Sequence, residues 1–466
     1  MGPGGTGMEG EALWRLAVAG LHEITVLAAF GFVLLGLSDL LVDLIWLGRE
    51  ARRAFVPAAG TVTAADLKVR KAGPLAVFVP AWDESAVIVP MLRHALATFD
   101  HPHYQIYVGC YPNDPATIVA VESLADPRIR LVIGTRNGPT SKADCLNQLW
   151  RALLADEQAP GAPRYRAVVL HDAEDVVHSC ELLVFDALLD RLPMIQLPVL
   201  PLISQSGRWV SAHYADEFAE AHGKELVVRE AIGAGVPSAG VGCAIRRDAL
   251  EALAGLLGQP FDEGSVTEDY ELGLRLRALG FRTAFVRMAA APNKGIVAVR
   301  AYFPNRLDAA VQQKSRWIAG IALSGWDRLG WRGGLAERWM RVRDRQAPLA
   351  AMLLLTAYAA LAAWLALSLL ALVAERPLVA FEGPLASLVA INMGLLLWRA
   401  VMRFSFTTAD HGLAQGCLSL PRMLVSNLIA VAAAREAMTR YFRSLREGRS
   451  EWGKTAHVFP SHMPPE

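Results

Sequence analysis

Apolar runs of two kinds divide this sequence into a central part and two ends. Long runs occupy the ends: Ile24–Leu47, Leu349–Val373 and the shorter Pro384–Trp398 have lengths that suit membrane-spanning helices. Pro421–Tyr441 is less apolar and contains arginines, which favours a helix lying in the membrane interface over a fourth span. In residues 72–280, short β-branched runs alternate with helical periodicity. This alternation predicts an α/β fold with a mostly parallel sheet and flanking helices.

The same pattern predicts four parts. Residues 1–71 are an N-terminal transmembrane anchor with a linker, 72–345 an α/β domain, 346–403 a transmembrane hairpin, and 404–466 the interfacial helix with a C-terminal tail. Arginines follow the first span and precede the second, which indicates that the α/β domain is cytoplasmic. Asp39 and Asp43 lie on one face of the first span, and they indicate an anchor helix that packs through its carboxylates onto other helices.

Composition limits the functions that remain. A net charge of +1 and a hydrophobic content of 53% disfavour nucleic-acid binding and disorder. The five cysteines have no C-x-x-C spacing, so a zinc site or a disulfide framework is not expected. This pattern fits a main domain that lies in a reducing cytosol.

Individual elements of the α/β part follow from the periodicity. Strands are expected at Leu75–Val79, Ile106–Cys110, Ile129–Ile133, Val168 onward and Met194–Leu200, and helices at Val87–Phe99, Ser141–Leu154, Ser265–Leu279 and Val311–Trp326. The glycine-rich segment Gly233–Gly242 lacks a dinucleotide-binding pattern, and we expect a loop that approaches a ligand closely.

The stretch Val168–Val177, VVLHDAEDVV, contains the strongest indication of a site. A buried strand ends there on three carboxylates, Asp172, Glu174 and Asp175. The carboxyl ends of parallel strands face a ligand crevice, and crowded carboxylates repel one another unless a cation lies between them. Hard divalent metals take oxygen ligands of this kind. The stretch alone is equally compatible with a metal site and with an exposed acidic turn.

Further motifs in residues 72–326 resemble those of the membrane-embedded family 2 glycosyltransferases, whose processive branch includes cellulose, chitin and hyaluronan synthases. In the family's order, the motifs are P-x-[YF]-N-E at Pro80–Glu84, an acid at Asp114, G-K-A-x-x-L-N at Ser141–Asn147, D-x-D at Asp172–Glu174, T-E-D at Thr267–Asp269 and Q-x-x-R-W at Gln313–Trp317. The last two motifs are intact. In the others, Asp83 replaces an Asn, Ser141 replaces a Gly and Glu174 replaces an Asp. The resemblance implies a GT-A-type fold.

A closer likeness links the chain to the bacteriophage adsorption protein B family, which are inner-membrane glycosyltransferases of Gram-negative bacteria. It rests on HDAEDVVH, GVPSAGVG, TEDYELGLRL, QKSRWIAGIALSGW and WGKTAHVFP. It implies a multi-pass protein of the bacterial inner membrane. A cyclic-di-GMP-binding domain often follows the transferase in that family, and because this sequence ends at Glu466, direct control by that nucleotide is left open. Lys454, Thr455 and His457 are expected to form either a gating segment over the donor or an ordinary polar tail.

The resemblance also implies a role for each matched residue. Asp269 is the expected general base, and Glu268, Gln313 and Trp317 are expected to bind the acceptor. A divalent ion, Mg²⁺ or Mn²⁺, would be held by Asp172 with Glu174 or Asp175, and the choice between the last two is open. The expected donor-binding residues are Pro80, Asp83, Glu84, Asp114, Lys142, Asp172 and Arg316.

These features together predict inverting transfer of a sugar from a nucleotide-sugar, a UDP-hexose or UDP-N-acetylhexosamine, to a growing glycan at the cytoplasmic face of the membrane. The intact Q-x-x-R-W and the flanking helices favour polymerisation and secretion of an exopolysaccharide. The expected partners are the donor, a glycan or lipid acceptor, membrane lipids and an outer-membrane secretion protein, with no nucleic acid. Two alternatives remain: single addition to a lipid acceptor, and a non-catalytic phage-entry or secretion scaffold.

Overall fold

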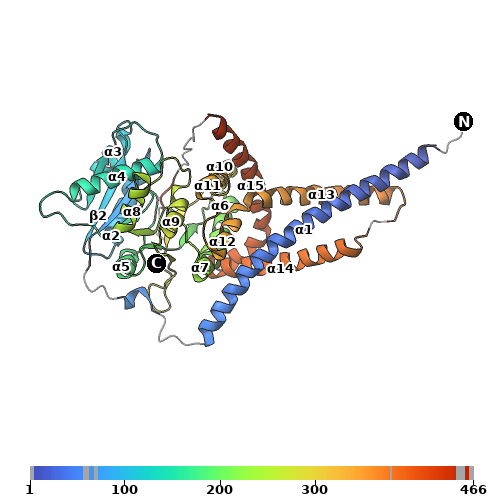
Figure 1. Cartoon of the computed structure of the whole chain (residues 1–466), viewed down its shortest axis with the longest axis horizontal. Helices are drawn as coiled ribbons and strands as arrows, with labels where there is room; N and C mark the ends of the chain where they lie inside the picture. The colour runs from blue at the N-terminus through green and yellow to red at the C-terminus, as the bar shows by residue number, and fades with distance from the viewer. Residues whose placement is uncertain (1–4, 56–61, 68–71, 378–379, 448–456, 461–466) are drawn as a thin grey trace.

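The computed structural model describes residues 5–55, 62–67, 72–377, 380–447 and 457–460. An α/β domain carries a group of long helices on one side (Figure 1). Helices α1 (Gly5–Phe55), α13 (Ala347–Val373) and α14 (Gly383–His411) extend away from the domain in one direction. Helix α15 (Leu413–Glu447) lies across the base of these three, beside the domain.

The predicted mostly parallel sheet is confirmed. Within the described residues the main sheet has seven strands in the order β3-β2-β1-β4-β7-β5-β8. Strand β7 is antiparallel to both of its neighbours, β4 and β5, and the other pairs are parallel. These strands are β1 (Leu75–Pro80), β2 (Tyr104–Cys110), β3 (Ile129–Ile133), β4 (Ala167–Leu170), β5 (Met194–Gln196), β7 (Cys243–Arg246) and β8 (Thr283–Phe285).

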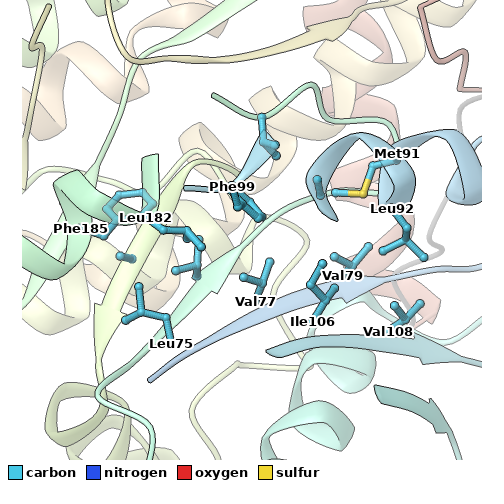
Figure 2. Packing of buried hydrophobic residues seen from close by; sticks show 14 of the residues in the cluster. Leu75, Val77, Val79, Met91, Leu92, Phe99, Ile106, Val108, Leu182 and Phe185 are labelled. Carbon is cyan, nitrogen blue, oxygen red and sulfur yellow. The ribbon is translucent and has the colours of Figure 1, made fainter. Parts of the chain in front are cut away.

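Helices cover both faces of this sheet, so its strands are apolar on both sides. Leu75, Val77 and Val79 of β1 pack against one set of helices (Figure 2), and Ala76 and Phe78, which alternate with them, pack against the other. The first set is α2 (Ile88–Thr98), α3 (Pro115–Glu122) and α5 (Glu181–Leu188), and the second is α4 (Lys142–Asp156), α8 (Arg247–Leu257) and α9 (Glu268–Ala278).

Shorter elements lie between the domain and the long helices (Figure 1). They are α6 (Arg208–Glu220), the π-helical turn η2 (Ala221–Glu225), α7 (Leu226–Ala231), α10 (Leu307–Ile318), the π-helical turn η3 (Ala319–Ser324), α11 (Gly325–Leu329) and α12 (Leu335–Arg345). A short 3₁₀ turn, η1 (Ala64–Asp66), precedes β1.

Two expectations about individual elements are wrong. Met194–Leu200 is not one strand, because the chain leaves the main sheet after β5 and enters a second, two-stranded parallel sheet of β6 (Val199–Leu202) and β9 (Val299–Tyr302). Pro198, which lacks an N–H, separates the two strands. Val311–Trp326 is not one regular helix, because α10 widens into η3 where Gly320 packs against Thr267. A π-turn of this kind is frequent near functional sites.

Within the described residues, four helices are long and apolar enough to cross a membrane, namely α1, α13, α14 and α15. The expectation that α1 packs through its aspartates is confirmed. Asp39 lies 2.9 Å from Arg343 and 3.3 Å from Arg399, and Asp43 lies 2.5 Å from Lys224. Each carboxylate therefore has a cationic partner from another helix, as charged groups at membrane depth require.

Helix α15 differs from the other three in its contacts. Its Arg422 is buried and donates to both oxygens of Asp216 on α6, at 2.6 and 2.8 Å. The helix also packs along α10, which belongs to the domain. Length and composition would suit a span, and the interfacial position predicted for residues 421–441 stays a prediction. The hairpin helix α14 continues to His411, beyond the predicted end at residue 403.

Candidate active site

The carboxyl ends of β1 and β4 bring two of the motifs together, because these strands are parallel neighbours. Pro80 ends β1, and the acidic turn follows Leu170 at the end of β4. Lys142, at the start of α4, supplies a cation at this edge, since its Nζ lies 2.5 Å from Asp172 Oδ1. Burial lowers the pKa of Lys142, but nearby carboxylates, led by Asp172, outweigh burial and raise it overall. Lys142 therefore stays charged.

The three carboxylates of the acidic turn have different surroundings. Asp175 is buried, and its Oδ2 accepts hydrogen bonds from His171 Nδ1 at 2.9 Å and from Asp172 N at 3.0 Å. Asp172 is a third exposed and faces Lys142. Glu174 Oε2 is buried and has no hydrogen-bond partner among the described residues. Burial raises the pKa of Glu174 to about 8. Asp175 thus shapes the turn, while Asp172 and Glu174 present oxygens to its surroundings.

Sequence reasoning missed the buried support of this turn. His171 lies between two carboxylates, with Nδ1 2.9 Å from Asp175 Oδ2 and Nε2 2.8 Å from Glu181 Oε1. Burial lowers the pKa of His171, but Glu181 and Asp175 outweigh burial and raise it to about 10. The imidazolium is therefore a fixed buried cation. The signal was present in HDAEDVVH, where His171 lies four residues before Asp175.

His457, near the C-terminal end of the sequence, also lies at the site. Its Nδ1 lies 2.8 Å from Glu84 Oε1 and 3.4 Å from Glu174 Oε2. Burial lowers the pKa of His457, while Glu174 and Glu84 raise it to about 9 overall. His457 therefore lies at the site, and a gating role of the segment stays a prediction. Lys454 and Thr455, the other residues of that expectation, lie outside the described residues.

Asp83 and Asp114 support a loop next to the site. Asp83 has a φ of 54°, and its N–H donates to Asp114 Oδ2 at 2.6 Å. Asp114 Oδ1 caps α3 by accepting from Thr117 N at 3.2 Å. Neither aspartate is among the residues that line the central cavity, whereas Glu84 is. Asp114 therefore acts as a helix cap, and the loop it fixes brings Glu84 to the cavity.

Glu268 and Asp269 begin helix α9 and face the glycine-rich loop. A Cβ at Gly240, where φ is 78°, would lie 2.6 Å from Asp269 Oδ2, so the loop can approach only as glycine. The same glycine accepts a hydrogen bond from Lys142 Nζ at 3.4 Å. Burial raises the pKa of Asp269 and raises that of Glu268 to about 8, while Lys142 opposes both shifts.

The Q-x-x-R-W residues lie on α10, and Gly320 in the turn that follows this helix packs against Thr267, next to Glu268. Gln313 Oε1 is buried without a hydrogen-bond partner among the described residues. Trp317 is half-buried against Tyr214, Phe218 and Phe303, with ring centroids 6.1 to 6.4 Å away. Burial, and after it Arg440, lowers the pKa of Arg316.

One cavity joins these groups, with a volume of about 2710 Å³. It continues between the long helices, where Phe32 of α1, Leu354 of α13 and Asn392 of α14 line it. All the predicted site residues except Asp83 and Asp114 contribute to its wall: Pro80, Glu84, Lys142, Asp172, Glu174, Asp175, Glu268, Asp269, Gln313, Arg316 and Trp317. The sequence motifs therefore converge on one cavity that also reaches the apolar helices.

Comparison with known proteins adds to this geometry. The profile of the family described as Glycosyltransferase like family 2 matches residues 72–320. The chain is 36% identical over 478 residues to Bacteriophage adsorption protein B of Escherichia coli strain K12, and equally to Bacteriophage N4 adsorption protein B of Escherichia coli O157:H7. Each alignment covers 95% of this chain and 63% of the relative, so the chain spans less than two thirds of their length.

Among solved structures, mannosyltransferase PcManGT from Pyrobaculum calidifontis, in complex with GDP-Man and Mn²⁺, is similar with a TM-score of 0.51 and 17% identity. The likeness covers 86% of this chain and 99% of that protein. At this identity it shows a shared fold, and the expected GT-A-type fold is confirmed.

Proposed function

The chain belongs to the family 2 glycosyltransferases, and from this premise we propose that it transfers a sugar from a nucleotide-sugar to an acceptor hydroxyl with inversion. The observation that carries the proposal is one cavity in which Lys142, Asp172 and Asp269 meet. Asp269 would accept the proton of the acceptor hydroxyl as that oxygen attacks the anomeric carbon. The carbon–oxygen bond to the diphosphate breaks in the same displacement, and the nucleoside diphosphate leaves.

Lys142 and Arg316 would bind the diphosphate of the donor. Both side chains line the cavity and carry positive charge, and Arg can form two parallel hydrogen bonds to one phosphate. Pro80, Asp83 and Glu84 would form the nucleoside side of the site, and Asp114 would hold their loop in place through its backbone hydrogen bonds. We propose a UDP-hexose or UDP-N-acetylhexosamine as the donor.

The residues fit a divalent ion, Mg²⁺ or Mn²⁺, that the protein and the donor would hold together. Asp172 and Glu174 offer carboxylate oxygens at the cavity, and the buried Glu174 Oε2 accepts no hydrogen bond among the described residues, although His457 Nδ1 lies 3.4 Å away as an ionic neighbour. No three His, Cys, Asp or Glu side chains converge on a metal position within the described part of the chain. This suits an ion that protein carboxylates hold together with substrate phosphates. When bound, such an ion neutralises charge on the departing diphosphate.

The acceptor would lie at the Trp317 end of the cavity. Trp317 offers an aromatic face for a sugar ring, and Gln313 Oε1 is a buried acceptor that a sugar hydroxyl can satisfy. Glu268, beside the base, would bind another acceptor hydroxyl. Because the cavity continues between the long helices, we propose that the product is a growing glycan that leaves through the membrane. Secretion would then involve an outer-membrane partner.

The arginines at the domain ends of the long helices support a cytoplasmic active site in a bacterial inner membrane. Arg53 lies in the last turn of α1, Arg343 lies on α12 just before α13, and Arg399 and Arg403 lie in the C-terminal half of α14. Positively charged residues accumulate on the cytoplasmic side of membrane helices.

A panel of nucleotide-sugars tests the proposal. The full chain in lipid nanodiscs is incubated with each donor and Mn²⁺ or Mg²⁺, and released nucleoside diphosphate and product length are measured. We expect metal-dependent release with one donor, abolished by a chelator, and products of many sugars. A product one sugar longer than its acceptor would favour the lipid-acceptor alternative. If neither the wild type nor Asp269→Asn released nucleoside diphosphate from any donor, this would favour a non-catalytic role of the kind that the relatives' names suggest.

A further inference from the structure

A buried hydrogen-bonded network connects the helix of the proposed base to the helix that precedes the membrane. Tyr270 follows Asp269 on α9, and its hydroxyl donates to Asp344 Oδ2 on α12 at 2.6 Å. Asp344 Oδ1 accepts from Arg229 Nη1 at 2.7 Å. Helix α12 ends at Arg345, and the membrane helix α13 begins two residues later (Figure 1). The first turn of α9 is therefore attached to the membrane-proximal helix.

The glycine-rich loop that faces Asp269 is attached to the same helix. Gly235 N donates to Glu337 Oε2 of α12 at 2.7 Å, and Gly235 O accepts from Arg229 Nε at 2.5 Å. The loop and α9 are in close contact, since a Cβ at Gly273 would lie 2.2 Å from Val236 O. Both structures that border the base, its own helix and the facing loop, thus share α12 as a support.

Burial and the surrounding contacts make this support rigid. Arg229, Tyr270 and Glu337 are all buried, and paired polar groups in a low-dielectric interior fix one arrangement strongly. Helix α12 is itself held in place, because Arg341 Nε donates to Glu337 at 3.0 Å and Arg343 lies 2.9 Å from Asp39 of α1. The position of the base therefore depends on the position of the membrane helices.

We propose that Asp344 is a positioning residue, which with Tyr270 and Glu337 holds the base and the loop facing it in the geometry needed for proton removal. The inference rests on the proposed function, because it assigns that role to Asp269. Proton transfer needs the base within hydrogen-bond reach of the acceptor. The groups assigned to the donor, Lys142 and Asp172, lie outside α9 and α12, and Lys142 contacts the loop at Gly240 O and not at Gly235, which binds α12. Loss of the network should therefore lower kcat and spare the KM for the donor.

The test compares two Tyr→Phe variants of the full chain in nanodiscs. Tyr270→Phe removes one hydroxyl from the network, and we expect kcat to fall about tenfold or more with the donor KM unchanged, as for a base displaced by a fraction of an ångström. Tyr441→Phe is the matched control, because its hydroxyl also donates to an aspartate, Asp327, at 2.7 Å, but between α15 and α11. The control should behave as wild type. Asp344→Asn keeps one oxygen for Tyr270 but turns an amide NH₂ toward the donating Arg229 Nη1, so it should lower kcat in the same way.

Hydrogen exchange of the α9 amides gives a second readout that does not need activity. We expect faster exchange in Tyr270→Phe than in Tyr441→Phe or wild type. Equal kcat and equal exchange in the two Phe variants would overturn the inference, as would a donor KM that rises in parallel with the loss of kcat. If the wild type transferred no sugar, the proposed function would fail, and exchange at α9 would still decide whether the network holds this helix.

Discussion

At the scale of single residues, Asp269 is surrounded by groups that suit a general base. Among its described contacts it is paired with no arginine. Lys142, Glu268 and the backbone of Gly240 form its buried surroundings. Asp269→Asn keeps the size of the side chain and removes its basicity. We expect kcat to fall by about 10²–10⁴-fold, the range for general acid–base catalysis. Asp308→Asn, in the first turn of α10 and exposed, should leave the release of nucleoside diphosphate unchanged.

The same environment determines the pH dependence. Burial raises the pKa of Asp269 above the ordinary carboxyl value of about 3.9. A base works only when deprotonated, so kcat should fall as pH drops through the raised pKa, and the fall should begin above the pH of an ordinary aspartate. The kcat of the wild type between pH 4 and 8 checks this. A kcat constant down to pH 4 would contradict the assignment.

Single residues also show the limits of sequence reasoning. The motifs located Lys142, Asp172 and Asp269 because residue type and order are local properties, and these residues do meet at one cavity. Asp114 is assigned to the donor, and that assignment stays a prediction; its oxygens also cap α3 and accept from Asp83 N, a structural role that the sequence did not reveal. His457 could not be connected to Glu84 at all, because 373 residues separate the two.

At the scale of elements, two carboxylates of the acidic turn after β4 differ in their partners, because Asp175 bonds to His171 and to Asp172 N, while Glu174 lies beside His457. Asp175→Asn removes a partner of the buried His171, and we expect unfolding free energy to fall by about 3 kcal/mol, as when one member of a buried ion pair is lost. Glu174→Gln should leave stability nearly unchanged and shift metal activation to higher concentrations. Thermal unfolding and a Mn²⁺ titration of activity measure the two effects.

The outcome of this pair also decides the question that the sequence left open. If Asp175→Asn shifted the metal titration while its unfolding matched wild type, Asp175 and not Glu174 would be the second ligand. The contacts of Asp175 with His171 and with Asp172 N make that outcome the unexpected one.

Elements were predicted well where their signal was periodic and poorly where it was short. Helix α4 and strand β3 were located within two residues or fewer by apolar spacing. Strand β7 was not foreseen, because Cys243–Arg246 is brief and its antiparallel position between β4 and β5 depends on long-range pairing. The split of Met194–Leu200 follows from sheet pairing that an apolar run does not encode.

At the scale of the whole molecule, the catalytic domain and the membrane helices form one unit. Buried pairs such as Asp43 with Lys224 and Asp216 with Arg422 connect them, and the cavity runs from Asp269 to residues of α1, α13 and α14. Such pairs are costly to break from one side, because a buried charge would be left alone. The domain and the long helices should therefore keep a fixed relative position, so that a product of the proposed transfer would always reach the same end of the cavity.

The path of the product can be tested by narrowing the cavity between the long helices. Ala357 of α13 lines the cavity, whereas Ala359 on the same helix is exposed and is not part of its wall. Ala357→Trp fills space that a glycan would need, so we expect products several-fold shorter with the initial rate of nucleoside diphosphate release little changed, since overpacking acts locally. Ala359→Trp should give products of wild-type length. Electrophoresis of the labelled glycan measures length, and equal lengths from the two variants would mean that the product does not pass between α1, α13 and α14.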